Sequence, residues 1–171
     1  RPELLSPKRW ARELGEGYQM TIADALYPIK ITVNRQMHEI QIPARRTLVD
    51  LLRYDLDMTG TKETCSVGVC GACTVLIDGE IAASCITLAV QVDGAEITTI
   101  EGVANGEALH PIQQSFIDHG GFQCGICTSG QIVAAKSLLD SNPSPTEDQV
   151  KVWMMGNLCR CTGYYQIMES I

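Results

Sequence analysis

Alternating apolar and polar residues over 29–33 predict a half-buried strand, which is the first regular element of the chain. A turn at 34–36 and a second alternating stretch over 38–42 complete a β-hairpin. Leucines with the spacing of one helix face follow over 48–56, and Thr47 precedes them as a suitable N-cap. This segment is therefore predicted to be a hairpin followed by a helix.

Further strands are expected after this helix. Residues 73–78 and 81–88 flank the hairpin turn signal Asp78-Gly79, and residues 94–100 supply a last strand. A glycine-containing loop, 61–71, lies between the helix and these strands. A hairpin, a helix and a loop that leads into further strands are typical of a β-grasp domain.

The second half of the chain has a helical pattern. Helices are expected from Pro111 to about His119 and over 129–141, where apolar residues recur near helical spacing. The capping-box sequence Thr146-Glu147-Asp148-Gln149 begins a third helix, and residues 164–171 begin a fourth. The fold class is therefore α+β, with a β-grasp domain followed by an all-α domain of four helices.

Three segments follow from this division. Residues 1–26 lack a clear period and are expected to be an N-terminal extension. Residues 27–104 are expected to form the β-grasp domain, and residues 105–171 the helical domain. Neither half repeats the other, because their cysteine spacings and their predicted secondary structure differ.

The eight cysteines fall into two groups of four, one in each predicted domain. The first group has the spacing C-x4-C-x2-C followed by a single cysteine, and the second combines C-x2-C with C-x-C. A [2Fe–2S] cluster takes four thiolates, and the first spacing has the plant-type ferredoxin order. The predicted ligands are Cys65, Cys70, Cys73 and Cys85 for one cluster, and Cys124, Cys127, Cys159 and Cys161 for the other.

Zinc and disulfides are the other common uses of paired cysteines. A C-x2-C with a distant cysteine pair is also a zinc pattern, so the second group alone leaves zinc open. Disulfides need no neighbouring glycines, whereas Gly68 and Gly71 accept backbone angles that let a loop wrap closely around a cluster. The amides of residues 66–72 can then donate to sulfur.

The net charge and the absence of known catalytic motifs exclude several classes of function. A formal charge of -7 without a basic patch disfavours nucleic acid, and the longest uncharged stretch, 120–135, is not apolar enough to span a membrane. Without a nucleotide-binding loop or a nucleophile elbow, the chain alone is expected to transfer electrons and to transform no organic substrate. A cytoplasmic bacterial location is expected, although a chain that begins at Arg1 leaves a removed export signal open.

Three motifs resemble those of the small iron–sulfur subunit of molybdenum hydroxylases, the xanthine dehydrogenase family. They are Cys65-Ser-Val-Gly-Val-Cys70-Gly-Ala-Cys73, Gln123-Cys-Gly-Ile-Cys-Thr128 and Gly156-Asn-Leu-Cys-Arg-Cys-Thr-Gly-Tyr164, in this order. Ser129 is a departure, because the family usually has proline there. Serine also suits the start of a helix.

The resemblance implies partners and an electron path. A large subunit would hold molybdenum on a pterin dinucleotide, and a medium subunit would hold FAD. Substrate would be hydroxylated with oxygen from water, and electrons would pass one at a time through both clusters to FAD. The cluster of the helical domain would lie nearer molybdenum. Gln123 and Cys161 match positions that contact the pterin.

The resemblance also bears on the class of substrate and on the assembly of the complex. An N-heteroaromatic substrate is favoured by the breadth of the family rather than by any residue of this chain. A dimer of heterotrimers is compatible with the same family. Two alternatives belong to other classes: a free two-cluster ferredoxin-like electron carrier, and a zinc-stabilised binding module without a redox role.

Overall fold

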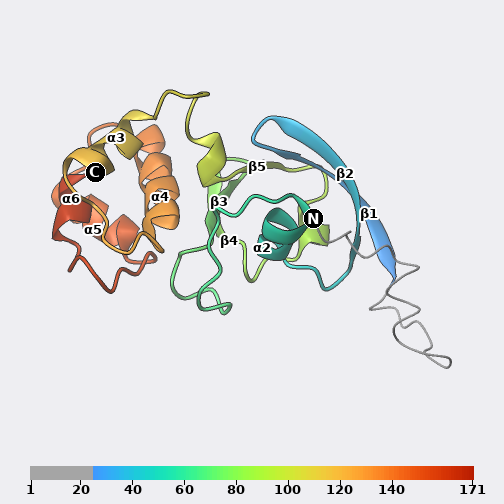
Figure 1. Ribbon diagram of the computed structural model, residues 1–171. Coiled ribbons are helices and arrows are strands. Elements are labelled where there is room, and N and C mark those ends of the chain that lie inside the picture. The colour runs from blue at the N-terminus through green and yellow to red at the C-terminus, as the bar shows by residue number, and fades with distance from the viewer. Residues whose placement is uncertain (1–24) are drawn as a thin grey trace.

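The computed structural model describes residues 25–171, which form a sheet part and a helical part that lie side by side (Figure 1). This arrangement confirms the predicted α+β fold. The strands are β1 (Leu26–Val33), β2 (Gln36–Pro43), β3 (Thr74–Ile77), β4 (Glu80–Ala83) and β5 (Glu96–Thr98). The helices are α2 (Leu48–Asp50), the π-helical η2 (Leu51–Asp55), the 3-10 turns η3 (Ala89–Val92) and η4 (Ile100–Gly102), α3 (Pro111–Asp118), α4 (Thr128–Ser141), α5 (Glu147–Met154) and α6 (Tyr165–Glu169).

The five strands form one mixed sheet with the order β2-β1-β5-β3-β4. The predicted hairpin is confirmed, since β1 and β2 pair antiparallel along their whole length. β1 pairs with β5 in parallel, and β3 pairs antiparallel with both β5 and β4. Ile29, Ile31 and Val33 point to the buried face, as the alternating pattern predicts, and pack with the leucines of α2 and η2.

The predicted helix behind the hairpin is confirmed, but it changes register after its first turn. Thr47 Oγ1 accepts a hydrogen bond from the Asp50 amide at 3.2 Å, as expected of an N-cap. The following residues are π-helical, and the Leu56 amide donates to the carbonyl oxygen of Leu51 at 3.1 Å. The wider turn keeps both Leu51 and Leu52 fully buried against the sheet.

The predicted return strand over 81–88 is wrong beyond Ala83. The backbone leaves the sheet there because it bonds to the start of the helix instead: the Val49 amide donates to the carbonyl oxygen of Ser84 at 3.1 Å. Cys85 therefore lies in the turn that follows β4 rather than within the strand. The turn brings this cysteine under the helix, where it is buried.

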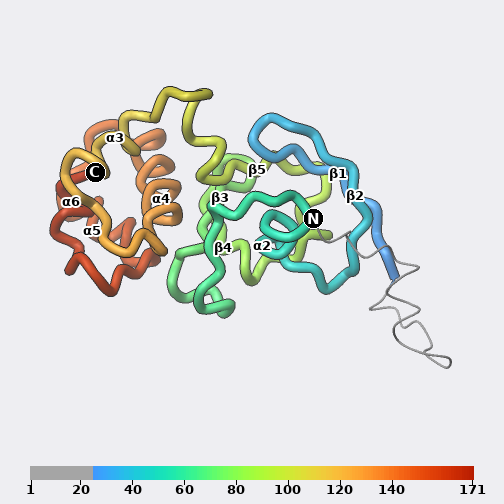
Figure 2. Tube along the Cα trace, viewed as in Figure 1, coloured from blue at the N-terminus to red at the C-terminus, as the bar shows by residue number. Residues whose placement is uncertain are grey.

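The predicted strand over 94–100 is also shorter, because only Glu96–Thr98 pairs with its neighbours. The amide of Thr99 donates to the side-chain oxygen of Asn34 at 2.9 Å, so the next residue is released from the sheet. The chain then passes to the helical part through the segment between β5 and α3 (Figure 2). The division of domains at 104/105 stays a prediction, and the predicted extension 1–26 lies almost wholly outside the described residues.

The helical part is built around α4, which packs against β3, α3 and α5 (Figure 1). Residues 130–135 of this helix are all buried. The predicted capping box before α5 is confirmed, because Thr146 Oγ1 accepts from the Gln149 amide at 3.3 Å. Trp153 joins α5 to α4 by donating its indole N–H to the carbonyl oxygen of Ala134 at 2.9 Å.

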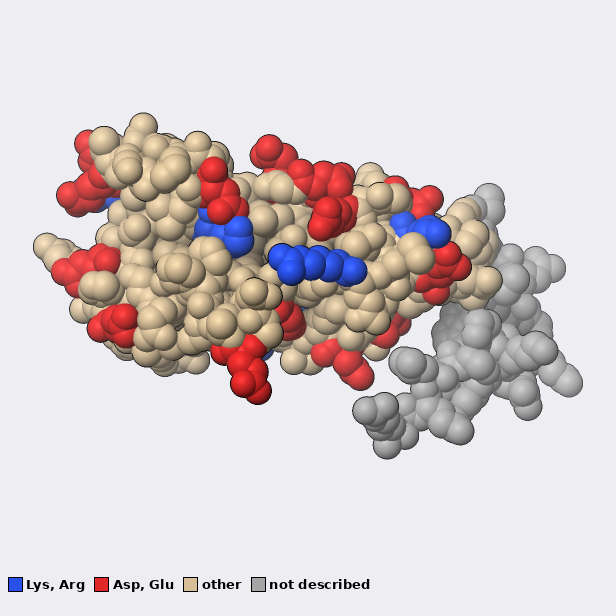
Figure 3. Space-filling view, turned by 90° about the horizontal axis from the view of Figure 1, so that it is seen from above, with Lys and Arg blue, Asp and Glu red and all other residues tan. Residues whose placement is uncertain are grey.

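The surface agrees with the acidic composition. Figure 3 shows acidic side chains around this face of the molecule and few basic side chains among them. Among residues 25–171, no helix is both long and apolar enough to cross a bilayer.

Candidate metal centres

The first group of cysteines lies where the loop before β3 meets the end of β4. Cys65 and Cys70 are half-buried on the loop, whereas Cys73 and Cys85 are buried against Val49 of α2. The structure therefore brings together all four cysteines of the first predicted set. Their assignment as ligands of one cluster stays a prediction.

The loop turns its amides toward sulfur, as the glycine pattern predicts. Gly68 and Gly71 have φ values of 76° and 69°, in the left-handed region that glycine enters without a steric penalty. The pKa of Cys65 is lowered to about 6, first by a hydrogen bond from the Val67 amide and then by the amide of Cys70. This loop can thus stabilise negative charge on its sulfurs.

The four sulfurs of the first group meet as two pairs. A hydrogen bond with Cys70 contributes to the lowered pKa of Cys65. Burial raises the pKa of Cys85 to about 11, and a hydrogen bond with the Cys73 thiol raises it further. The pairs are therefore Cys65 with Cys70, and Cys73 with Cys85.

The second group of cysteines lies in two loops of the helical part. Cys124 and Cys161 are exposed, and their sulfur atoms are 3.5 Å apart. Cys127 and Cys159 are buried. The pKa of Cys127 is raised to about 12, mainly by burial and next by its hydrogen bond with Cys159. These four cysteines thus also meet as two pairs.

Two pairs of thiols match the ligand set of a [2Fe–2S] cluster. Such a cluster needs two thiolates on each of two irons, whereas zinc needs its four ligands around one point. Within residues 25–171, Thr128 Oγ1 and Ser129 Oγ are buried without a hydrogen-bond partner, so polar groups remain available beside Cys127.

A direct backbone contact joins the two cysteine loops. The amide of Leu158, which precedes Cys159, donates to the carbonyl oxygen of Cys70 at 2.8 Å. Cys70 of the first loop thus accepts this hydrogen bond, and Cys159 of the second loop is the residue next to its donor. The two candidate centres are connected by a short path through the backbone.

Buried polar side chains fix this contact. Asn157 donates through Nδ2 to the carbonyl oxygen of Gly71 at 3.0 Å and to Thr74 Oγ1 at 3.2 Å. Gln131 on α4 donates to the carbonyl oxygen of Asn157 at 2.7 Å. Sequence reasoning missed these roles, although a glutamine among the apolar residues of a buried helix is a signal that could have found one of them.

The two predicted pterin contacts lie on the exposed side of the second group. Gln123 is exposed and directly precedes Cys124, whose sulfur pairs with that of Cys161. The structure thus brings the two residues to one face, and their contact with a pterin stays a prediction.

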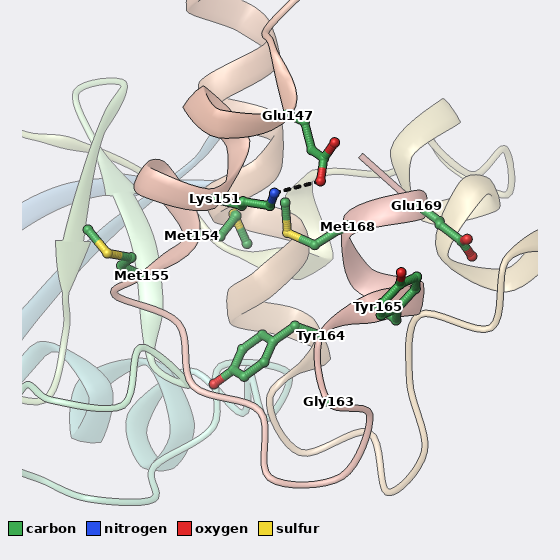
Figure 4. Close-up of a pocket in the computed structure, with 9 residues that line it drawn as sticks. All are labelled: Glu147, Lys151, Met154, Met155, Gly163, Tyr164, Tyr165, Met168 and Glu169. Carbon is green, nitrogen blue, oxygen red and sulfur yellow. Dashed lines mark ion pairs between the residues drawn. The ribbon is translucent and has the colours of Figure 1, made fainter.

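A hollow of about 790 Å³ lies beside the same loop (Figure 4). Its walls come from α5, α6 and the turn between Cys161 and α6. Lys151 and Glu147 form an ion pair of 2.6 Å at one side. The lining residues are Glu147, Lys151, Met154, Met155, Gly163, Tyr164, Tyr165, Met168 and Glu169.

In the chain without clusters, Cys65 is expected to be alkylated before Cys127. At about pH 7 a thiol with a pKa near 6 is mostly thiolate, whereas a buried thiol with a pKa near 12 stays protonated, and the thiolate is the reactive form. Timed iodoacetamide labelling with peptide mass spectrometry measures the order. Earlier modification of Cys127 would contradict the described geometry.

Comparisons with known proteins agree with two cluster-binding segments. Residues 31–107 match the family model described as a 2Fe-2S iron-sulfur cluster binding domain, and residues 99–171 match the [2Fe-2S] binding domain. The chain is 48% identical over 143 residues to the nicotine 6-hydroxylase small subunit of Paenarthrobacter nicotinovorans, covering 84% of this chain and 86% of that protein. It is 46% identical over 143 residues to the nicotinate dehydrogenase small FeS subunit of Eubacterium barkeri, covering 84% of this chain and 91% of that protein.

A solved structure has the same fold. The structure of quinoline 2-oxidoreductase from Pseudomonas putida 86 superposes with a TM-score of 0.83 at 47% identity. The match covers 85% of this chain and 90% of that chain. Sequence and structure therefore agree over both the sheet part and the helical part.

Proposed function

The chain belongs to the iron–sulfur subunits of the molybdenum hydroxylase family, and from this membership we propose that it carries electrons between a molybdenum site and a flavin site on two partner subunits. Its general role is that of an iron–sulfur subunit in an oxidoreductase complex. The proposed source is a molybdenum–pterin dinucleotide on a large subunit, and the proposed acceptor is FAD on a medium subunit.

The observation that carries the proposal is the hydrogen bond between the two cysteine loops. A relay needs two centres held at a fixed separation, and the contact from the Leu158 amide to the Cys70 carbonyl oxygen supplies this. The eight cysteines named from the sequence would hold the clusters, four in each part. When bound, each [2Fe–2S] cluster accepts and releases one electron.

Exposed apolar residues beside each group support docking of partner subunits. Val67, Val69 and Ile86 are 61–65% exposed near the first group. Phe122 and Ile126 are exposed near the second group. Apolar side chains gathered around a functional site are expected where another protein covers it. Gln123 and Cys161 lie on the face of the second group, so this face is proposed to meet the molybdenum subunit.

The names of three similar proteins support an N-heteroaromatic substrate. Two relatives are small subunits of a nicotine 6-hydroxylase and a nicotinate dehydrogenase, and one solved structure is a quinoline 2-oxidoreductase. We propose that the complex containing this chain hydroxylates a substrate of that class, with oxygen from water. The substrate would bind to the large subunit, because this chain offers electron-transfer groups rather than a substrate site.

Purification of the tagged chain from its native host tests the proposed partners. Co-purification of molybdenum and flavin with the chain, together with about four irons per chain, is the expected result. Native mass spectrometry on the same sample distinguishes a heterotrimer from a dimer of heterotrimers. A chain that holds its iron but purifies without molybdenum and flavin would instead support a free electron carrier.

Replacement of Leu158 by proline is expected to slow electron delivery to flavin in the complex. Proline has no backbone N–H, so the bond to the Cys70 carbonyl oxygen is lost. Leu158→Ala is the matched control, because it removes the side chain and keeps the amide. Rapid mixing with substrate, followed at the flavin absorbance, measures the rate in variants with unchanged iron content. Equal rates for the two variants would contradict this role.

A further inference from the structure

The turn after the C-x-C pair contains a tyrosine in an unusual backbone conformation. Tyr164 has a φ of 73°, in the left-handed region that bulky residues rarely adopt. Such a conformation is strained for a bulky residue and persists only where the surrounding structure fixes it. The residue directly precedes α6, which begins at Tyr165.

Hydrogen bonds at both ends of the residue hold Tyr164 in this conformation. Its amide donates to Thr162 Oγ1 at 3.1 Å, and its carbonyl oxygen accepts from the Met168 amide at 2.9 Å. Its hydroxyl oxygen accepts a hydrogen bond from the Cys159 amide at 3.0 Å. The strained backbone thus places the phenol group against the first cysteine of the C-x-C pair.

The same contacts lead back to the sulfur of Cys159. Thr162 Oγ1 lies 3.2 Å from Cys159 Sγ, and the Thr162 amide donates to this sulfur at 3.5 Å. Tyr164 therefore holds the side chain that contacts the sulfur and also engages the amide of the same cysteine. A closed ring of hydrogen bonds fixes the loop around Cys159.

These bonds determine which amides are free to face a cluster. Amide donors to cluster sulfurs stabilise the extra negative charge of the reduced state, so their number tunes the reduction potential. In the first group the amides of Val67 and Val69 bond to Cys65. In the second group the Thr162 amide donates to Cys159 Sγ, whereas the Cys159 amide donates to the phenol oxygen.

We propose that Tyr164 is a positioning residue that sets the reduction potential of the cluster held by the second cysteine group. This inference rests on the proposed function and adds a residue outside the predicted ligands. The phenol withholds the Cys159 amide from the cluster by accepting its hydrogen bond. With one amide donor fewer, the added negative charge of the reduced cluster is less stabilised, so Tyr164 holds the potential low.

The neighbouring tyrosine provides a matched control. Tyr164 and Tyr165 point to different sides of the hollow (Figure 4). Tyr165 is 76% exposed, whereas Tyr164 is 36% exposed. Replacing either tyrosine with phenylalanine removes one hydroxyl group. Of these two hydroxyl groups, only that of Tyr164 bonds to the cysteine loop.

The experiment is a redox titration followed by EPR on the tagged complex carrying Tyr164→Phe or Tyr165→Phe. The expected result is a higher midpoint potential and altered g-values for one of the two iron–sulfur signals in Tyr164→Phe, with the other signal unchanged. Tyr165→Phe is expected to match the parent protein. Iron content and the thermal unfolding midpoint are measured on each sample to verify loading and folding.

The outcomes separate this inference from the proposed function. Two signals with unchanged potentials in Tyr164→Phe, or an equal shift in both signals, would overturn the inference while the electron-transfer role stands. Absence of iron–sulfur signals from the parent complex would overturn the proposed function itself. If Tyr164→Phe loses iron, a fluorinated tyrosine at position 164 keeps the ring and hydroxyl but weakens the oxygen as an acceptor. A smaller upward shift of the same signal is then expected, and no shift would overturn the inference.

Discussion

Replacing Cys161 with serine is expected to lower the iron content from about four to about two per chain, because each [2Fe–2S] cluster needs four thiolates. The sulfur of Cys161 pairs with that of Cys124 at 3.5 Å, and serine offers an oxygen that is a poorer ligand for this centre. One of two EPR signals is expected to disappear from the reduced sample. Iron analysis and EPR on the same preparation measure both effects.

The reciprocal variant Cys65→Ser serves as the control for this prediction. Cys65 belongs to the first group, so its loss is expected to remove the other signal and leave the Cys161-dependent one. Retention of full iron and both signals in Cys161→Ser would contradict the assignment of the second group. Removal of the same signal by both variants would contradict the division into two groups.

Gly130→Ala is expected to destabilise the chain by about 1–3 kcal/mol, because a methyl group does not fit between α4 and the first cysteine loop. A β-carbon at this position would overlap the carbonyl oxygen of Gly71. That oxygen also accepts from Thr74 Oγ1 at 2.7 Å and from Asn157 Nδ2 at 3.0 Å. Movement of the loop would therefore break buried hydrogen bonds between the two parts.

Gly156→Ala is the matched control for this variant. A β-carbon at Gly156 would meet open space among the described residues, and its backbone does not require a left-handed φ. Its effect is expected to stay within about 0.5 kcal/mol. Urea unfolding followed by far-UV circular dichroism gives the midpoints of both variants. Equal midpoints would contradict the close approach of α4 and the Gly71 loop.

Features with a local cause could be predicted from the sequence. The hairpin follows from alternating residues, and the caps at Thr47 and Thr146 follow from side chains that bond to nearby amides. The grouping of the cysteines follows from their short spacings. Gly68 and Gly71 were predicted to allow a close loop, and their left-handed angles confirm this.

Features that depend on contacts between distant segments could not be predicted in this way. The strand over 81–88 ends at Ala83 because Ser84 bonds to Val49, 35 positions away by their numbers in the sequence. The bond between the Leu158 amide and Cys70 likewise requires the folded arrangement of both parts. Local periodicity carries no information about such pairings.

The site combines both kinds of feature. The cysteines were predicted because metal ligation restricts residue type and spacing, but their partition into sulfur pairs appears only in the structure. Asn157 and Tyr164 act through a carbonyl oxygen and an amide, and almost any residue type supplies those backbone groups. Their roles therefore follow from geometry rather than from the residues that surround them in the chain.

EPR of the dithionite-reduced complex, with iron and molybdenum counted on the same sample, decides whether this chain is a two-cluster relay within a molybdenum hydroxylase. We expect two distinct rhombic signals, about four irons per chain and co-purifying molybdenum. One signal with zinc making up the balance would contradict the assignment of the second cysteine group. Two signals without molybdenum or a flavin protein would contradict the role as a subunit of a molybdenum hydroxylase.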